Sequence, residues 1–256
     1  MSTVGASLSM LKNPAILQFI LKGLAFTMVV SLIAVIIGIL FGSVLALVRN
    51  YCTGKTRVLK WLATAYIEIF RNTPLLLWIF ICVVFCPSPK FLSKPMFTLT
   101  SVEVGLLFKA CVALVLFTSS VIAEIVRGGL NAVAQGQFEA GHSQGFNTVQ
   151  IMVYIVLPQA YRSVIPTLLG QCITTIKDSS YLANVAVIEL MSRVKKILSA
   201  ANMYNGQINV SDVFILFGVA FVIYFIINFI LSCTVRYLQK RSKRNKQVTV
   251  ELLTTE

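Results

Sequence analysis

The first apolar run of this chain limits what it can fold into more than any other feature. Residues 24–48, LAFTMVVSLIAVIIGILFGSVLALV, contain no charged side chain and are closed by Arg49. About 20 such residues suffice for a helix that crosses a bilayer, where every backbone polar group must find its partner inside the protein. The chain is 57% hydrophobic and only 12% charged over 256 residues. The sequence therefore predicts an all-α integral membrane protein.

Four more apolar regions follow, so we expect five membrane-spanning helices. The second region contains Glu68, Arg71 and Pro74, and a proline inside a helix removes an amide donor, which predicts a kink or a break. The fourth region loses its apolar character at the sequence KDSS. The predicted spans cover residues 24–48, 59–85, 104–126, about 161 to 177–180, and 213–235.

Basic residues predict how the chain is oriented. They gather between the first and second spans and again after the fifth, and such clusters mark cytoplasmic segments. The N-terminus is then outside, the C-terminus is cytoplasmic, and the basic segment 191–200 lies outside, against the rule. We expect one transmembrane domain over residues 1–235 and a basic cytoplasmic tail over residues 236–256, in which residues 239–247 contact anionic lipid. This accounts for the net charge of +13 without nucleic acid.

The chain offers little for catalysis or metal binding. Its six cysteines are scattered, with only Cys82 and Cys86 close in sequence, and we expect them to be small buried hydrophobes. The single histidine, His142, is expected to be a surface contact residue. A membrane enzyme would need clustered His, Asp or Glu side chains, and one histidine with nine acidic residues argues against it. We expect no metal, no cofactor and no enzymatic activity on this chain.

A polar stretch punctuated by glycine lies between the third and fourth predicted spans. Residues 139–160 read EAGHSQGFNTVQIMVYIVLPQA. This pattern predicts a short helix, a turn at Gly145, where the missing side chain permits a sharp bend, and a second helix that ends at Pro158. With the orientation given above, this helix-turn-helix lies on the cytoplasmic face, where it has the shape of a docking element.

In identity and spacing this stretch resembles the EAA loop of bacterial ABC importer permeases. Gly141 stands where that family usually has alanine, which is one small residue for another. Three further segments resemble the polar amino acid branch of the family, which includes the histidine and glutamine permeases. These segments are FRNTPLL (70–76), SSVIAEIVRGGLNAVAQGQFEAG (119–141) and IKDSSYLANVAVIEL (176–190), with departures at Asn72, Ser179 and Tyr181.

The resemblance implies a type I ABC importer permease fold in the bacterial cytoplasmic (inner) membrane. It implies import of a polar amino acid, with a slight preference for a basic one. The implied partners are a dimer of ATPase subunits, a second permease that is either identical or related, an extracytoplasmic solute-binding protein and membrane lipid. The residues that would couple the chain to the ATPase are Glu139, Ala140, Gly141, Gly145, Ile155, Leu157 and Pro158.

The energy source separates two classes of transporter. The sequence contains no G-x-x-x-x-G-K-[ST] phosphate loop, so ATP hydrolysis would take place on another chain. The alternative is a secondary amino acid carrier driven by an ion gradient. Such carriers are commonly built from internal repeats, and the five predicted spans show none.

Charged residues at membrane depth are the candidates for substrate contact. Lys177, Asp178, Ser179 and Ser180 interrupt a predicted span, where free backbone groups are tolerated only beside protein or a wet cavity. A broken helix with both charges could hold a zwitterion, although Lys177 and Asp178 could equally form a structural pair. Arg71 is the next candidate.

Two pairs of charges have helical spacing. Arg71 either pairs with Glu68, three residues earlier, or faces the cavity. Glu124 and Arg127 have the same spacing, and we expect them to pair.

Overall fold

The structure is a computed structural model that describes residues 13–92, 94–95, 99–205 and 210–254. Every element in it is a helix, which confirms the predicted all-α class. The α-helices are α2 (Pro14–Tyr51), α3 (Arg57–Arg71), α4 (Leu75–Phe85), α5 (Ser101–Asn131), α6 (Gly136–Ser143), α7 (Thr148–Gln150), α8 (Leu157–Asp178), α9 (Leu190–Asn205) and α10 (Val210–Thr254). The shorter elements are the 3-10 helices η1 (Gly54–Thr56), η2 (Lys90–Leu92) and η4 (Ser179–Val185) and the π-helix η3 (Ile151–Val156).

Four helical segments of the described residues are long and apolar enough to cross a membrane. They are Pro14–Tyr51, Ser101–Asn131, Thr148–Val185 and Val210–Lys240. The second predicted span is a bent pair instead, with an angle of 109° between Gly54–Arg71 and Leu75–Phe85. The expected break at Pro74 is confirmed, because this residue is the N-cap of α4 and has an extended backbone. The structure thus has four candidate spans, or five if the bent pair counts as one.

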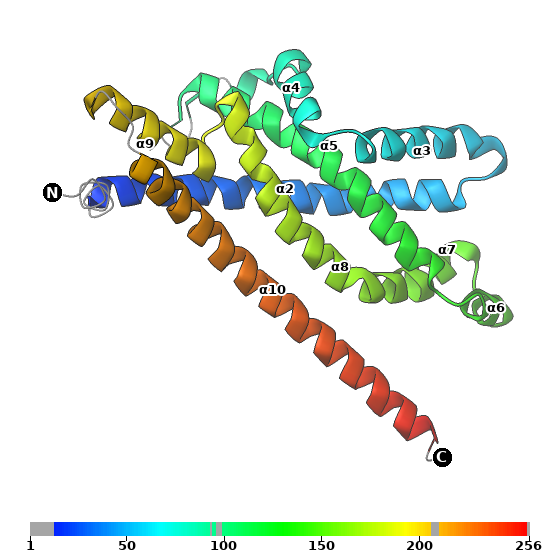
Figure 1. The fold of residues 1–256 in the computed structure, drawn as a ribbon. Coiled ribbons are helices and arrows are strands. Elements are labelled where there is room, and N and C mark those ends of the chain that lie inside the picture. The colour runs from blue at the N-terminus through cyan, green and yellow to red at the C-terminus, as the bar shows by residue number, and fades with distance from the viewer. Residues whose placement is uncertain (1–12, 93, 96–98, 206–209, 255–256) are drawn as a thin grey trace.

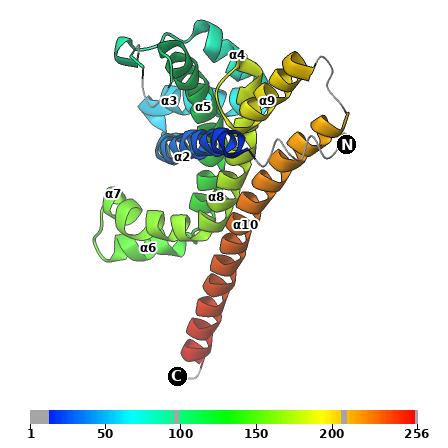
Figure 2. The same cartoon turned by 90° about the vertical axis from the view of Figure 1, so that its left-hand side faces the viewer.

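Helix α2 packs against α3, α5, α8 and α9. Figure 1 shows it passing through the molecule with α5 and α8 crossing it, and Figure 2 shows it nearly end-on. Its buried side is made largely of small residues, at Gly23, Thr27, Ser31, Ala34, Gly38, Gly42 and Ala46. Small side chains let two helix backbones approach closely, which in a membrane replaces the hydrophobic driving force that lipid does not supply.

The closest approach of α2 to α5 occurs at two glycines one turn apart. A Cβ atom built on Gly42 would lie 2.6 Å from the carbonyl oxygen of Ser119 and 3.0 Å from the amide nitrogen of Ala123. One built on Gly38 would lie 3.2 Å from the side chain of Thr118. Because the atoms that crowd Gly42 belong to the backbone, a larger residue there would have to push the two helices apart.

The molecule has two ends with different character. At one end α9 packs beside the first turns of α2, and at the other end α6 and α7 project from the helices (Figure 1). Helix α10 begins near α9 and runs toward the end that carries α6. The predicted tail, residues 236–256, forms the last part of α10 as far as Thr254.

The second helix of the polar stretch does not end at Pro158, and this expectation is wrong. The chain stays helical from Thr148 through η3 into α8, and Pro158 occupies the first turn of α8. The π-helical segment just before it changes the hydrogen-bond spacing, so the helix passes the proline without breaking.

A glycine-to-alanine change at position 42 should measure the close helix contact. We expect Gly42→Ala to destabilise the protein by about 1–3 kcal/mol, the usual cost of overpacking. The matched control is Gly218→Ala on α10, where nothing lies within 4 Å of the added atom. Thermal unfolding in detergent checks this, and equal midpoints for the two variants would contradict the contact.

Candidate functional site

The turn between α6 and α7 is built from two complementary helix caps. The amide of Phe146 donates to the carbonyl of Gly141 and that of Gly145 to His142, the bond pattern of a Schellman motif. Gly145 has a φ angle of +83°, as this motif requires at that position. Asn147 and Gln150 then cap α7 reciprocally, each side chain accepting from the other's backbone amide. The turn expected at Gly145 is therefore confirmed, and its geometry is fixed by local bonds.

Gly141 lets α6 pack tightly against the π-helical segment. A Cβ atom at this position would lie 2.7 Å from Cγ1 of Ile151 and 3.2 Å from Cδ1 of Ile155. Ile151 and Val156 are fully buried, and they join a core formed by α2, α5 and α8. The glycine that departs from the family's usual alanine thus tightens the contact between the two helices. The whole α6–α7 unit is anchored to the body of the protein through η3.

The residues expected to meet an ATPase divide into two groups. Glu139, Ala140, Gly145 and Pro158 are exposed, whereas Gly141 is buried and Ile155 and Leu157 are half-buried. The structure adds exposed apolar side chains that the sequence reasoning missed, at Phe146, Val149, Val153 and Tyr154, with Val149 and Tyr154 each 71% exposed. Their spacing could have revealed them, because Phe146, Val149 and Val153 recur at intervals of three and four residues. His142 is exposed, as expected.

The segment Lys177–Ser180 lies where α8 changes into the 3-10 helix η4. The α-helix ends at Asp178, which matches the expected interruption. The backbone nevertheless stays helical, and the amide of Ser179 bonds to the carbonyls of Thr175 and Lys177, so it is not freed for a ligand as a full break would allow. Lys177 is exposed, Asp178 and Ser180 are half-buried, and Ser179 is buried. Among the described residues, no ion pair within 4 Å joins Lys177 to Asp178.

Five charged residues from three helices form one cluster around Glu124. Its carboxylate lies 3.1 Å from Arg49, and it also pairs with Arg127, as the spacing predicted. Glu68 pairs with Arg49 at 2.8 Å. Arg71 lies 3.9 Å from Glu124.

The cluster corrects the alternative in which Glu68 pairs with Arg71. Glu68 and Arg71 lie on the same face of α3, as their spacing predicts. The carboxylate of Glu68 nevertheless accepts from Arg49, which approaches from α2. Within the described part of the chain, no hydrogen bond or ion pair connects Arg71 to Lys177 or Asp178. The two candidate substrate positions are therefore not brought together by direct bonds.

Glu189 is a buried carboxylate to which the sequence reasoning gave no role. It is fully buried and accepts from the amides of Met191 and Ser192, from the hydroxyl of Thr27 and from that of Tyr224. It thus joins the start of α9 to α2 and α10. Burial raises the pKa of Glu189, while its four donors lower it by a smaller amount. A lone acid between apolar residues, as in AVIEL, was the available signal.

Arg193 is also interior, although the sequence reasoning counted it only as an orientation signal. It is 5% exposed, its Nη1 donates to the carbonyl of Phe19, and its guanidinium stacks 4.3 Å from that ring. Burial lowers the pKa of Arg193, and the nearby Glu103 opposes this shift. An arginine used in this way no longer counts as a loop charge, which weakens the conflict between segment 191–200 and the expected orientation.

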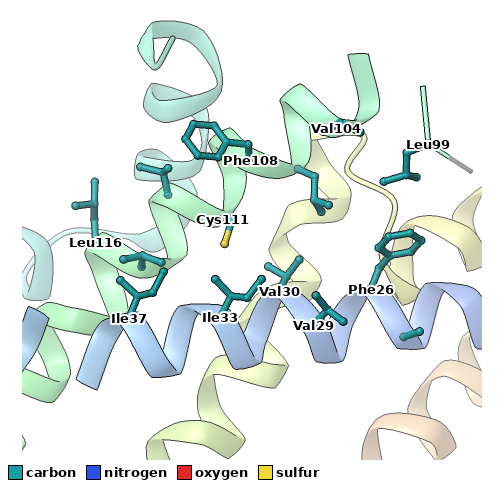
Figure 3. Close-up of a pocket in the computed structure, with 14 residues that line it drawn as sticks. Phe26, Val29, Val30, Ile33, Ile37, Leu99, Val104, Phe108, Cys111 and Leu116 are labelled. Atoms are coloured by element: carbon teal, nitrogen blue, oxygen red, sulfur yellow. The ribbon is translucent and has the colours of Figure 1, made fainter. Parts of the chain in front are cut away.

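An apolar cavity of about 700 Å³ opens between α2 and α5 (Figure 3). Its walls are hydrocarbon side chains such as Val30, Ile33 and Phe108, together with the thiol-bearing Cys111. It has no charged partner for a carboxylate or an ammonium group, so we assign it no substrate.

The cysteines are free thiols, and they differ in exposure. Buried thiols were expected at all six positions, but only Cys82 is buried, four others are half-buried, and Cys233 is exposed on α10. In the described residues no group of three or more His, Cys, Asp or Glu side chains could hold a metal ion.

Comparison with known proteins agrees with this geometry. The sequence signature of the family described as "Binding-protein-dependent transport system inner membrane component" matches residues 38–244. The chain is 34% identical to the "Probable glutamine ABC transporter permease protein GlnM" of Bacillus subtilis (strain 168), covering 88% of this chain and 94% of the relative. It is 31% identical to the "Glutamate/aspartate import permease protein GltK" of Escherichia coli O157:H7, with the same coverage of both.

Two solved structures share the fold. A crystal structure of an amino acid ABC transporter with histidines has a TM-score of 0.70 and 26% identity, covering 91% of this chain and 97% of that one. The MetNI methionine ABC transporter in an inward-facing conformation has a TM-score of 0.63 and 19% identity, with 88% and 99% covered.

Together with the all-helical fold, these matches define the chain as the membrane-spanning subunit of an ABC importer. The chain belongs to the family of binding-protein-dependent transport system inner membrane components. It is a permease of the bacterial inner membrane, and the alternative of a secondary carrier receives no support from these matches.

Removing the central carboxylate should show how far the charge cluster holds α2, α3 and α5 together. We expect Glu124→Gln to lower stability by about 1.5–3 kcal/mol, because Arg49, Arg71 and Arg127 all lose a charged partner. Glu68→Gln is the matched control, since Glu68 is 46% exposed and pairs with Arg49 alone among the arginines, so a smaller loss is expected. Thermal unfolding of both variants measures this, and a larger loss for Glu68→Gln would contradict the central place of Glu124.

Proposed function

We propose that this permease pairs with a second copy or a related permease and moves a polar amino acid into the cytoplasm. The α6–α7 turn would receive the motion of a separate ATPase dimer. The observation that carries this proposal is the turn itself, which is fixed by caps, exposes apolar side chains and is anchored in the core by Ile151 and Val156. An exposed apolar surface on a rigid, projecting element is suited to docking.

The helix that follows the turn gives the motion a path. From Thr148 to Asp178 the chain is helical without interruption, passing through η3 into α8. Its far end carries Lys177 and Asp178. A displacement of α6 and α7 would therefore reach the candidate substrate segment through one continuous element.

The orientation follows from the position of the coupling turn. If α6 meets a cytoplasmic ATPase, then α9 and the first turns of α2, at the opposite end of the molecule, face the extracytoplasmic side. The N-terminus is then outside, and the far end of α10 is cytoplasmic. A solute-binding protein would deliver the substrate at the α9 end.

The relatives support a polar amino acid as the substrate. Their names give glutamine for one and glutamate or aspartate for the other, and the solved relative contains histidines. These names give no support to a preference for basic amino acids. Lys177 would hold the carboxylate and Asp178 the ammonium group, which every free amino acid offers.

A residue that disfavours the positive φ angle of Gly145 should disrupt the turn. Nothing lies within 4 Å of a Cβ built on Gly145, so a clash is not the constraint, but an L-residue at a φ of +83° costs about 1–2 kcal/mol. We expect Gly145→Val to lower ATP-driven uptake in proteoliposomes by about tenfold, a change equivalent to about 1.4 kcal/mol. Gly145→Asn is the control, because asparagine tolerates this conformation. Normal uptake by Gly145→Val with a bound ATPase would refute the coupling role.

The variant Asp178→Asn should show whether Asp178 binds substrate or serves the stability of the fold. If Asp178 holds the ammonium group, the variant loses a charge-assisted bond of about 1.5–3 kcal/mol, so affinity falls at least tenfold while thermal stability stays normal. If Asp178 only balances Lys177, stability falls and affinity does not. Uptake and thermal unfolding of the same reconstituted complex decide between the two, and the second result would remove Asp178 from the site.

A further inference from the structure

A second cavity lies at the α9 end of the molecule, away from the coupling turn. Its volume is about 400 Å³, and it is enclosed by the first turns of α2, the start of α5 and α9. Small-molecule sites in proteins commonly have volumes from about 300 Å³ upward, so a single amino acid fits this space. Unlike the apolar cavity between α2 and α5, this one has charged walls.

The charges of this cavity are unbalanced. Lys22, Arg193 and Lys196 line it together with one acid, Glu103. The ion pairs found among the described residues all belong to the Glu124 cluster, so none of these three cations has a carboxylate within 4 Å there. The cavity therefore has an excess of positive charge that favours an anionic group.

Arg193 is held in place but not fully bonded. Its Nη1 donates to the carbonyl of Phe19 at 3.1 Å, and its guanidinium stacks on the Phe19 ring. Its Nε is buried and has no hydrogen-bond partner. A buried donor without an acceptor is unfavourable, so an acceptor from outside the described protein atoms would stabilise this side chain.

Glu103 provides the opposite charge at the other wall. Its Oε2 caps α5 by accepting from the amide and the hydroxyl of Thr100. Its Oε1 makes no hydrogen bond within the described residues. Leu99 and Ile188 add apolar surface to the same cavity. The cavity thus offers basic groups, one acid and an apolar wall, which are the three parts that a free amino acid needs.

We infer that this cavity is a binding site for a free amino acid at the extracytoplasmic end of the permease. The carboxylate lies toward Arg193, Lys22 and Lys196, the ammonium group lies toward Glu103, and the side chain meets Leu99 and Ile188. The inference rests on the proposed function, because it assigns the site to the transported amino acid before that molecule reaches Lys177 and Asp178.

The site is connected to the interior through the first turn of α9. The amide of Arg193 donates to the carbonyl of Glu189, whose carboxylate accepts from Thr27 on α2 and Tyr224 on α10. A ligand that draws Arg193 toward the cavity would thus act directly on the junction of three helices. This gives the site a physical route to the rest of the molecule.

The test is equilibrium binding of radiolabelled L-glutamine, L-glutamate and L-histidine to the permease with its ATPase in phosphatidylcholine nanodiscs, without binding protein. The variant Asp178→Asn removes the proposed contact at the candidate substrate segment, so the binding that remains is assigned to the cavity. In this background we expect Lys22→Gln together with Lys196→Gln to weaken the remaining binding at least tenfold. Lys195→Gln is the matched control, because the neighbouring lysine bonds Asn184 and does not line the cavity. Glu103→Gln should also weaken binding while keeping the cap of α5, since glutamine can serve in a capping box.

Four results would overturn the inference. If Asp178→Asn abolishes all binding and the lysine variants change nothing, the cavity is not an amino acid site, and the proposed function stands. If none of the three amino acids binds the unmodified complex, the proposed function fails as well. If phosphatidylglycerol displaces the amino acid only while the two lysines are present, the cavity holds a lipid headgroup. If the lysine variants leave amino acid binding unchanged and weaken the association of the solute-binding protein in a parallel measurement with that protein added, the charges serve docking.

Discussion

The close packing of α2 on α5 is the constraint on which the rest of this structure depends. Because Gly42 meets the backbone of Ser119 and Ala123, the two helices have one permitted spacing there. Three polar contacts then occur at successive depths along α2: Phe19 with Arg193, Thr27 with Glu189, and Arg49 with Glu68 and Glu124. Each needs its partners placed to within a hydrogen-bond length, which a loosely packed helix in lipid could not provide.

The charge cluster shows how ionisable groups are accommodated in such a protein. Arg49 is shared between Glu68 of α3 and Glu124 of α5, so one guanidinium joins three helices. A guanidinium suits this role because its donors are fixed in a planar fork. The side chains remain 19% to 46% exposed for these three residues, so the cost of removing charge from water is only partly incurred. The cluster therefore fixes the arrangement of the helices more than it adds to their stability.

Most local features of this fold could be predicted from the sequence, except the helix end expected at Pro158, and tertiary ones could not. The apolar runs, the break at Pro74 and the turn at Gly145 were all predicted, because each depends on a few neighbouring residues. A pair between Glu68 and Arg71 was expected from their spacing. That spacing contains no information about Arg49 of another helix, which is the partner that Glu68 has in the structure. The burial of Arg193 and the bonds of Glu189 were missed for the same reason. The candidate substrate residues could be placed in sequence, but their backbone was expected to be more open than the 3-10 helix that follows Asp178.

The candidate substrate segment is followed by a residue with a strained backbone. Ala186, between η4 and Glu189, has a φ of 57°, an unfavourable conformation for a residue with a side chain. Such strain persists only where the surrounding contacts fix the backbone, and here Leu182 and Val187 on either side are buried in the core. The backbone between the candidate substrate segment and Glu189 is therefore fixed by its surroundings. Since the carboxylate of Glu189 accepts from Thr27 inside α2 and from Tyr224 inside α10, and Glu189 directly precedes α9, a change in this segment would have to be shared with the packing of three helices.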